Sequence, residues 1–251
     1  MTNDGIAGKT ALVTGGSRGI GREISLLLGK AGAKVAVNYV NDEQAALAVQ
    51  TQITNAGGEA IAVQGDVSET KQVDSMLGET EAALGSVDIL VCNAGIGERG
   101  LADLTPYEAW QRIMKVNVDG VYLPVMAVKD GMKARGDGRI VCIASIAGLR
   151  PRPSNVTYAT SKAAVIAFVR NVSGVLAPEV RINTIAPGLI ETDMIQNMDP
   201  ARRAAMIDGT PLERIGQPEE IAEMTMFLLS DRASYTTGQT LVASGGRVTV
   251  P

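Results

Sequence analysis

The stretch Thr10-Ala-Leu-Val-Thr-Gly-Gly-Ser-Arg-Gly-Ile-Gly21 decides the fold class of this chain. Its first part, Thr10 to Thr14, is a short apolar and β-branched run of the kind that forms a buried strand. A glycine-rich turn follows, and apolar residues then recur at helical spacing from Gly21 to Ala31. A strand, a glycine-rich turn and a helix in this order predict a loop whose backbone amides hold a pyrophosphate.

The glycine pattern taken alone is weak evidence, because the chain contains 28 glycines and an ordinary glycine-rich turn is the alternative. Its position directly after the first predicted strand favours the nucleotide site. The candidate cofactor-binding residues of the turn are Gly15, Ser17, Arg18, Gly19, Ile20 and Gly21.

The rest of the chain repeats the alternation of short strands and longer helices. Continuously apolar runs such as DILVC and RIVCIA predict strands that are covered by helices on both faces, as in a parallel sheet. We therefore expect an α/β fold of the Rossmann type, doubly wound and three-layered, with a seven-stranded parallel sheet. The further predicted strands are Lys34 to Asn38, Ala60 to Gln64, Asp88 to Cys92, Arg139 to Ser145, Arg181 to Ala186 and Thr240 to Ala243.

No linker, low-complexity tract or repeat interrupts this alternation, so we expect residues 1–251 to form one dinucleotide-binding catalytic domain. Helical spacing from Gln217 to Ser230, with Pro218 suited to the first turn, predicts a late crossover helix. The segment 189–212 is less regular and combines mixed charge with Met194, Met198 and Met206. We expect this segment to be a mobile cover over the substrate site.

Composition limits the partners of the protein. The chain has 23 basic and 27 acidic residues and a net charge of −4, so we expect no nucleic acid and no membrane partner. No apolar stretch is long enough to span a bilayer, and the first residues lack the pattern of a signal peptide. We expect a cytoplasmic protein whose partners are small molecules.

The chain contains no histidine, which removes the commonest metal ligand and the usual general base. Cys92 and Cys142 both lie within apolar runs, where a small buried thiol is the usual role. We therefore expect neither a metal site nor a cysteine nucleophile, and acid/base chemistry must use other side chains.

The end of the second predicted strand indicates which nicotinamide cofactor is used. Sites that prefer NAD place an acidic residue there to bind the ribose 2′-hydroxyl, whereas this chain has Asn38. Together with Arg18, a neutral amide suits a 2′-phosphate, so we predict NADP(H). The alternative is that Arg18 is a solvated loop cation and that Asp42 binds the ribose.

Acid/base residues follow the fifth predicted strand. Tyr158 and Lys162 are four residues apart and share one face of a predicted helix, and Ser145 precedes them. A nearby ammonium favours the phenolate and would bring the tyrosine pKa closer to neutrality. A lone Tyr-x-x-x-Lys is more often structural, so the pair gains weight only from the other motifs.

These motifs together identify a resemblance: the chain resembles the short-chain dehydrogenases/reductases over essentially its whole length. The order and spacing of the motifs match the family, and joint coincidence is negligible. The matching residues are Thr14-Gly15-x-x-x-Gly19-x-Gly21, Asp66-Val67, Cys92-Asn93-Ala94-Gly95, Asn117, Ser145, Tyr158-x-x-x-Lys162 and Pro187-Gly188-x-x-x-Thr192.

The resemblance implies how these residues act. Tyr158 would donate a proton to the carbonyl oxygen, Ser145 would hydrogen-bond that oxygen, and the nicotinamide would deliver hydride. Lys162 would bind the nicotinamide ribose and lower the tyrosine pKa, while Asn117 would hold a water that relays protons from Lys162. For Asn93 and Asn117, stabilisation of a turn or a helix bend is the alternative. The remaining implied cofactor contacts are Asp66 and Val67 on the adenine, Asn93, Ala94 and Gly95 on the adenosine side, and Pro187, Gly188, Ile190 and Thr192 along the nicotinamide.

The segments TGGSRGIG, PGLIETDM, PLERIGQPEEIA and TTGQTLVASGG are most similar to 3-oxoacyl-acyl-carrier-protein reductases, which reduce 3-oxoacyl thioesters with NADPH. Short-chain alcohol dehydrogenases that act on cyclic, sugar or steroid alcohols share them and remain the alternative. Non-catalytic NADP(H) sensors fit less well, because this chain keeps Tyr158 and Lys162. Sugar-nucleotide epimerases fit less well, because they normally have a different glycine spacing. The segment from Asn171 to Glu179 departs from the carrier-protein reductases, which puts docking of a carrier protein in doubt.

Two further expectations concern partners. Basic residues around the fifth predicted strand are either a site for a phosphopantetheine or CoA phosphate or ordinary solvated loop charge. These residues are Lys133, Arg135, Arg139, Arg150 and Arg152. The resemblance also implies a homotetramer built through the helices at 117–133 and 158–175 and through the last strand and tail. The apolar content of those helices exceeds what one buried face needs, and a dense core within one chain is the alternative.

Overall fold

The computed structural model describes residues 4–97, 106–193, 195 and 198–249. Within these residues the predicted strands form close to their expected positions. The strands are β1 (Thr10–Val13), β2 (Lys34–Tyr39), β3 (Glu59–Gln64), β4 (Val87–Cys92), β5 (Gly138–Ile143), β6 (Val180–Pro187) and β7 (Thr240–Ala243). The fifth strand ends earlier than predicted, because Ser145 leaves the sheet and caps a short 3-10 turn, Ile146–Gly148.

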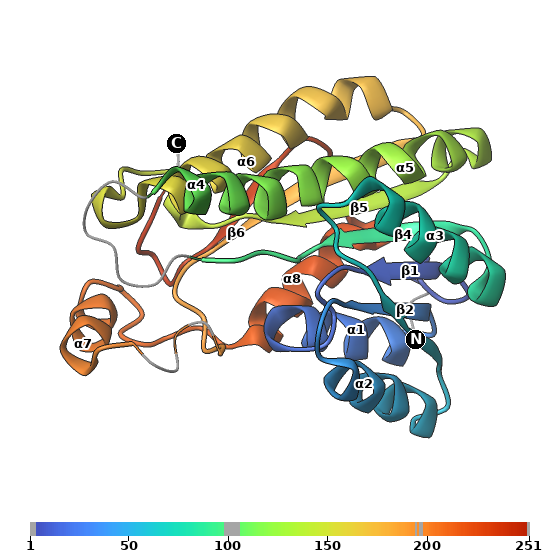
Figure 1. The fold of residues 1–251 in the computed structure, drawn as a ribbon, viewed down its shortest axis with the longest axis horizontal. Coiled ribbons are helices and arrows are strands. Elements are labelled where there is room, and N and C mark those ends of the chain that lie inside the picture. The colour runs from blue at the N-terminus through green and yellow to red at the C-terminus, as the bar shows by residue number, and fades with distance from the viewer. Residues whose placement is uncertain (1–3, 98–105, 194, 196–197, 250–251) are drawn as a thin grey trace.

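All seven strands pair in parallel in the order β3-β2-β1-β4-β5-β6-β7, which confirms the predicted Rossmann-type sheet. The order reverses between β1 and β4, since the chain first winds outward through β2 and β3 and then returns to the other side of β1 (Figure 1). Ligands of such sheets bind outside the carboxyl ends of the strands at this reversal. The functional site is therefore expected beyond Val13 and Cys92.

Helices cover both faces of the sheet (Figure 1). Successive strand residues point to opposite faces, so Ala11 and Val13 pack with one set of helices and Leu12 with the other. The first layer contains α1 (Gly19–Lys30), α2 (Glu43–Asn55) and α8 (Pro218–Leu229), and the second contains α3 (Thr70–Leu84), α5 (Gly120–Arg135) and α6 (Val156–Leu176). The three-layer, doubly wound prediction is confirmed.

Local sequence explains where α8 begins. Pro218 occupies its first turn, as predicted, and Gln217 and Glu220 form a capping box around it. The Glu220 carboxylate accepts the backbone N–H of Gln217 at 2.7 Å and also pairs with Arg214. Two of the amide groups that a helix start leaves unpaired are thereby satisfied.

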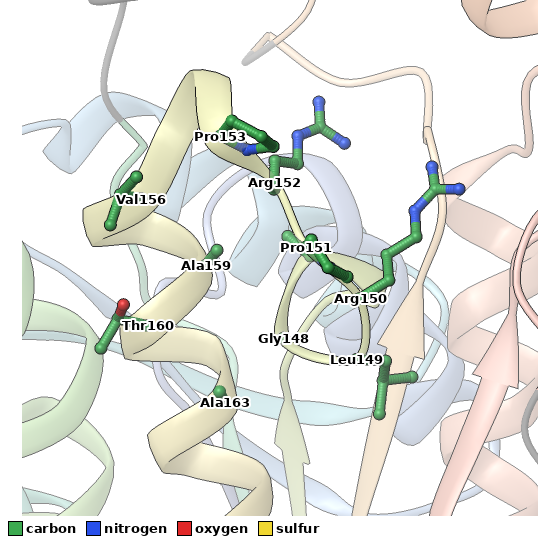
Figure 2. A pocket seen from close by; sticks show the side chains of 11 residues that line it. Gly148, Leu149, Arg150, Pro151, Arg152, Pro153, Val156, Ala159, Thr160 and Ala163 are labelled. Carbon is green, nitrogen blue, oxygen red and sulfur yellow. The ribbon is translucent and has the colours of Figure 1, made fainter. Parts of the chain in front are cut away.

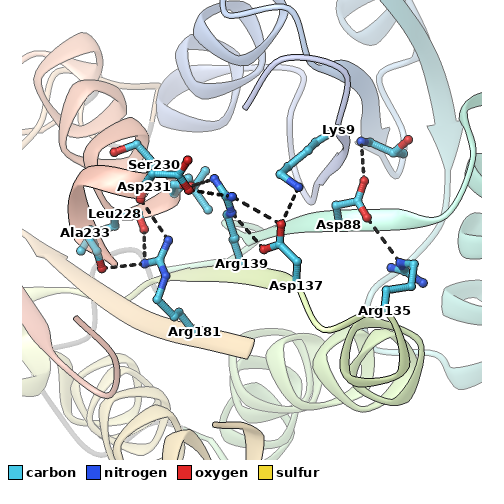
Figure 3. A network of polar contacts seen from close by, with 12 residues as sticks. Lys9, Asp88, Arg135, Asp137, Arg139, Arg181, Leu228, Ser230, Asp231 and Ala233 are labelled. Carbon is cyan, nitrogen blue, oxygen red and sulfur yellow. Dashed lines mark hydrogen bonds and ion pairs between the residues drawn. The ribbon is translucent and has the colours of Figure 1, made fainter. Parts of the chain in front are cut away.

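A polar network ties the amino ends of the central strands to α8 (Figure 3). The buried Arg139 pairs with Asp137 at 3.3 Å and with Asp231 at 2.9 Å, while Lys9 reaches Asp137 at 2.6 Å. Arg181 donates to backbone carbonyls at the end of α8 and in the turn after it. Although burial opposes ionisation, the hydrogen bonds from Lys9 and Arg139 hold the pKa of Asp137 below its ordinary value.

The segment 189–212 leaves the sheet after β6 and includes α7 (Pro200–Asp208), which Figure 1 shows apart from the three layers. A bridge between Ile190 and Gly216 and a hydrogen bond from the Leu212 N–H to the carbonyl of Gly245 at 3.0 Å attach it to the rest of the chain. Within the segment, an ion pair between Glu191 and Arg203 joins its first residues to α7. Met194, which we predicted to belong to a mobile cover, lies outside the described residues. Among the helices that are described, none has the length and apolar character needed to cross a bilayer.

Candidate active site

The glycine loop between β1 and α1 leaves room for a ligand at the reversal point of the sheet. Gly15 and Gly19 adopt φ angles of +59° and +53°, a left-handed conformation that side-chain-bearing residues rarely adopt. A Cβ at Gly21 would lie 2.3 Å from the carbonyl oxygen of Gly15, so only glycine permits this close turn. No side chain caps the start of α1, whose N-cap residue is the exposed Arg18. The free amides and the helix dipole suit an anionic pyrophosphate.

Asn38 has a different role from the one its sequence position suggested. We predicted that its amide would face a 2′-phosphate, but the side chain is buried beneath the glycine loop. Its Oδ1 accepts the backbone N–H of Gly15 at 3.1 Å, and its Nδ2 donates to the carbonyl of Gly65 at 2.9 Å. A buried amide satisfies its own polar groups first, so Asn38 positions the loop instead of reaching a ligand.

Asn93, at the end of β4, fixes the other side of the same loop. Its Nδ2 donates to the carbonyls of Thr14 and Gly15, both at 3.0 Å. The hydroxyl of Thr14 in turn accepts the backbone N–H groups of Asn93 and Ala94 at 3.0 and 3.1 Å. The turn-stabilising alternative for Asn93 therefore holds, and it leaves Ala94 and Gly95 beside the loop.

Asp66 and Val67 come shortly after β3, the edge strand that pairs with β2. One carboxylate oxygen of Asp66 accepts both the backbone N–H and the hydroxyl of Ser68, at 2.9 and 2.7 Å. Val67 is buried, and a Cβ on Gly120 would lie 2.6 Å from its side chain. Asp66 remains half-buried, whereas Val67 packs against the start of α5.

The segment after β6 completes this region. The backbone N–H of Gly188 donates to the carbonyl of Ala243 at 2.8 Å, which continues the β6–β7 pairing past Pro187. Ile190 is buried against Gly216. The side chain of Thr192 comes to 3.3 Å from a Cβ position built on Gly19, so the predicted nicotinamide segment meets the glycine loop.

Ser145, Tyr158 and Lys162 come together at the carboxyl end of β5. Tyr158 and Lys162 lie one turn apart on α6, and the Lys162 ammonium lies 5.8 Å from the centre of the tyrosine ring. Gly148 brings the turn after Ser145 directly against α6, because a Cβ there would lie 2.6 Å from the backbone nitrogen of Ala163. A larger residue at Gly148 would separate Ser145 from Tyr158.

Asn117 connects this triad to the end of β4. It lies in a π-helical turn, Lys115–Asp119, between α4 (Tyr107–Met114) and α5. Its side chain is fully buried and binds the backbone of Ile96 through both Oδ1 and Nδ2, at 2.8 and 2.9 Å. Its Nδ2 also donates to Ser161 at 3.0 Å. A Cβ on Gly95 would lie 3.3 Å from both Asn117 and Lys162, so these two side chains are neighbours. π-turns are frequent at functional sites.

Burial dominates the protonation of the triad. Burial raises the pKa of Tyr158 above 10.0, and the hydrogen bond with Ser145 and the charge of Arg152 only partly offset it. Burial lowers the pKa of Lys162 from 10.5 to about 8. We expected Lys162 to lower the pKa of Tyr158, but here its ammonium donates to the Ile143 carbonyl at 2.9 Å and the lowering groups are Ser145 and Arg152.

The basic residues around β5 divide into two sets. Lys133, Arg135 and Arg139 lie towards the amino ends of the strands and bind backbone carbonyls or carboxylates there. Arg150 and Arg152 lie beyond the carboxyl end of β5, and the charge of Arg152 acts on Tyr158. The five residues flank the predicted strand on both sides in the sequence, and the structure separates them because the two ends of β5 lie at opposite edges of the sheet.

The two cysteines are buried register partners on β4 and β5, in agreement with the predicted role of small core thiols.

Comparisons with known proteins agree with this geometry. A family model described as enoyl-(acyl carrier protein) reductase matches residues 15–247. The chain is 41% identical over 245 residues to a 3-oxoacyl-acyl-carrier-protein reductase of Synechocystis sp., covering 97% of this chain and 98% of that protein. A short-chain type dehydrogenase/reductase from Mycobacterium marinum superimposes with a TM-score of 0.92 at 36% identity, covering 98% and 97% of the two chains. A 7α-hydroxysteroid dehydrogenase in complex with NADH and 7-oxo glycochenodeoxycholic acid gives a TM-score of 0.93 at 36% identity and the same coverage.

Proposed function

The chain belongs to the short-chain dehydrogenase/reductase family and is an oxidoreductase that acts on CH–OH groups or the matching ketones; from this premise we propose that it reduces a 3-oxoacyl thioester with NADPH. The observation that carries the proposal is the meeting of Ser145, Tyr158 and Lys162 beside a glycine loop suited to a pyrophosphate. The supporting relative, at 41% identity over nearly the full length, is a reductase of this substrate class.

In the proposed reaction Tyr158 donates its phenolic proton to the substrate's carbonyl oxygen, because it is the acidic group that hydrogen-bonds Ser145. Ser145 holds the same oxygen. When bound, the nicotinamide cofactor supplies the hydride that the carbonyl carbon receives. Lys162 binds the nicotinamide ribose, and Asn117, its neighbour across Gly95, relays the replacement proton through water. The carbonyl thereby gains a hydride and a proton and becomes a secondary alcohol.

The surroundings of the adenosine ribose support NADPH over NADH. Arg18 is exposed at the start of α1, and among the described residues no carboxylate forms an ion pair with it. Asp42, the alternative ribose ligand, accepts the backbone N–H of Ala45 at 3.0 Å as the N-cap of α2. An engaged carboxylate is less available to a 2′-hydroxyl, whereas a free guanidinium suits a 2′-phosphate.

We further propose that residues 1–251 act as one catalytic domain and that the segment 189–212 covers the substrate. The contact of Thr192 with Gly19 and the attachment of α7 through Arg203 support a cover that begins at the cofactor.

The second candidate is a dehydrogenase of cyclic, sugar or steroid alcohols. The 7α-hydroxysteroid dehydrogenase favours it, since that protein is as similar in structure as any relative named above and was solved with NADH.

The test is the rate of NADPH oxidation with acetoacetyl-CoA as a thioester surrogate, compared with cyclic and aliphatic ketones. We expect the thioester to give the highest kcat/KM and NADPH to exceed NADH in kcat/KM. Turnover of simple ketones without the thioester would instead support the second candidate. Equal kcat/KM with NADH and NADPH would overturn the cofactor preference.

A further inference from the structure

Four arginines from three separate parts of the chain gather beyond the carboxyl end of β5. Arg150 and Arg152 lie in the loop between β5 and α6, Arg202 lies on α7 and Arg247 follows β7. Arg150 donates to the backbone carbonyl of Arg247 at 3.5 Å, which joins the first loop to the last. We call these residues the arginine cluster. Only Arg150 and Arg152 belong to the basic residues predicted from the sequence, because Arg202 and Arg247 are distant from them in the chain.

The cluster lacks a described counter-charge. None of its members forms an ion pair with a carboxylate in the part of the chain that the structure describes, whereas Arg203, beside Arg202, pairs with Glu191. The Nε of Arg247 is buried and has no hydrogen-bond partner among the same residues. Burial and then the charges of Arg202, Arg150 and Arg247 lower the pKa of Arg152, so the guanidinium groups repel one another. Such repulsion is unfavourable, and a bound anion would relieve it.

An open pocket of about 480 Å³ adjoins the cluster (Figure 2). Arg150 and Arg152 line it, and Figure 2 shows their side chains extending from the loop in the same direction. The turn that carries Arg150 and Arg152 directly follows Ser145 and packs on α6 beside Lys162, and the charge of Arg152 acts on Tyr158. Ser145, Tyr158 and Lys162 do not themselves line the pocket, so the cluster lies next to the reacting groups and not among them. In a protein of net charge −4, this local excess of cations is opposite to the overall balance.

We propose that the arginine cluster is a substrate site that binds an oxyanion, a carboxylate or a phosphate, carried by the same molecule as the reacting carbonyl. Guanidinium groups match both oxyanions with paired N–H donors. The inference rests on the proposed function for the position of the carbonyl at Tyr158. It adds that the substrate is negatively charged, either as an oxo acid or as a thioester with a phosphate-bearing carrier.

Two pairs of ketones that differ mainly in charge test the site. Acetoacetate and its methyl ester differ by a carboxylate, while acetoacetyl-CoA and the N-acetylcysteamine thioester of acetoacetate differ by the phosphates. We expect Arg152→Gln to lower kcat/KM for the charged member of at least one pair by about 10- to 100-fold, mainly through KM. Any effect of the lost Arg152 charge on Tyr158 is common to both members of a pair, so the ratio of kcat/KM for the charged member to kcat/KM for the neutral member is the readout. A loss confined to the acetoacetate pair identifies a carboxylate, and a loss confined to the acetoacetyl-CoA pair identifies a phosphate.

Arg170→Gln is the matched control, because Arg170 is an exposed arginine on α6 outside the cluster. It should leave both ratios of charged to neutral substrate unchanged. The proposal is overturned if wild type turns over the charged substrates and neither Arg152→Gln nor Arg150→Gln changes the ratio of charged to neutral kcat/KM in either pair.

A binding measurement separates this proposal from the proposed function. Malonate and inorganic phosphate are titrated by calorimetry into the protein saturated with NADPH, so that the cofactor's own phosphate sites are filled. We expect one of the two anions to bind the wild type and to bind Arg152→Gln at least about tenfold more weakly. Equal affinity for the two proteins, or no binding to either, would contradict the cluster. Anion binding without turnover of any thioester would contradict only the thioester substrate.

Discussion

Burial shifts the pKa values of two residues in the candidate active site. Tyr158 and Lys162 are shifted in opposite directions, because burial disfavours the phenolate of one and the ammonium of the other. The result is a proton donor that stays protonated near neutral pH beside an amine that titrates at about 8. This arrangement suits reduction, in which the tyrosine must give up a proton to the substrate.

Replacement of Tyr158 by phenylalanine tests the role of the hydroxyl. The ring keeps its place on α6, but the proton donor is lost, so kcat should fall by about 10²- to 10⁴-fold. NADPH affinity, measured by fluorescence titration, should stay within about threefold of wild type. Near-normal turnover would show that another group supplies the proton.

Replacement of Lys162 by methionine should increase stability while removing activity. The pKa of Lys162 falls from 10.5 to about 8 on folding, so burial of the charge opposes folding at neutral pH. At about 1.4 kcal/mol per pKa unit, the variant should gain about 1–3 kcal/mol of unfolding free energy at pH 7, reduced by the lost hydrogen bond to Ile143.

The pH dependence of this gain has a definite sign. Below pH 8 both folded and unfolded states hold the proton, so the gain is constant. Between about pH 8 and pH 10.5 only the unfolded state holds the Lys162 proton, so the stability of the wild type rises with pH. The stability advantage of Lys162→Met therefore shrinks over this range. Urea denaturation at fixed protein concentration from pH 7 to 10 measures the difference in unfolding free energy between Lys162→Met and wild type. A variant less stable than wild type at pH 7 would contradict the prediction.

At the scale of elements, the site depends on close approaches between helices and loops. Gly148 allows the turn after β5 to lie on α6, and the π-turn at Asn117 directs that side chain to Ile96 and Ser161. Asn38 on β2 and Asn93 after β4 hold the glycine loop from the two strands on either side of β1. These contacts position the proposed reacting groups and take no part in the reaction themselves.

The capping box of α8 gives a prediction about one helix start. Glu220→Ala should lower the unfolding free energy by about 1 kcal/mol, since it removes the acceptor of the Gln217 N–H and the partner of Arg214. Those contacts hold the pKa of Glu220 at about 2, against 4.5 when unfolded. The carboxylate's contribution is therefore complete above about 4.5 and is lost as the pH falls towards 2.

Urea denaturation between pH 7 and pH 3 measures this effect. Glu219→Ala is the control, since Glu219 is also exposed in the first turn of α8 but lies outside the capping box. An equal loss of stability in both variants would argue against the capping contacts.

On the scale of the whole molecule, the two ends of the sheet differ in charge. Ion pairs among Lys9, Asp137, Arg139 and Asp231 fasten the amino ends of the strands (Figure 3). Beyond the carboxyl ends lie the exposed Arg18 and the arginine cluster. One end therefore stabilises the fold, while the cations at the other form no ion pair with a carboxylate among the residues that the structure describes.

The homotetramer remains a prediction. Between α5 and α6 lies an apolar groove of about 310 Å³ lined by Val118, Asp119, Val121, Tyr122, Val165 and Phe168. We expect light scattering to give four times the mass of 26.2 kDa. Phe168→Glu should dissociate the assembly, since it places a charge in this groove.

Lys30→Glu, an exposed change on α1 in the opposite helical layer, should leave the measured mass unchanged. A monomeric wild type at working concentration would remove the prediction.

The sequence alone determined the fold class and the strands, and it named Ser145, Tyr158 and Lys162 as the candidate triad. Periodicity is a local property, and continuous apolar runs between helical segments permit few arrangements other than a parallel sheet. The helical spacing of Tyr158 and Lys162 placed them on one face, and the order of motifs identified the family. These features depend on residues near one another in the chain.

Only the tertiary structure decided what each polar group faces. Asn38 turned inward because its amide finds Gly15 and Gly65 beneath the loop, contacts between segments more than twenty positions apart. Arg202 and Arg247 come from distant elements to lie near Arg150 and Arg152, which no local pattern indicated. Burial and charge at a site are sums over neighbours in space, and the chain order does not specify those neighbours.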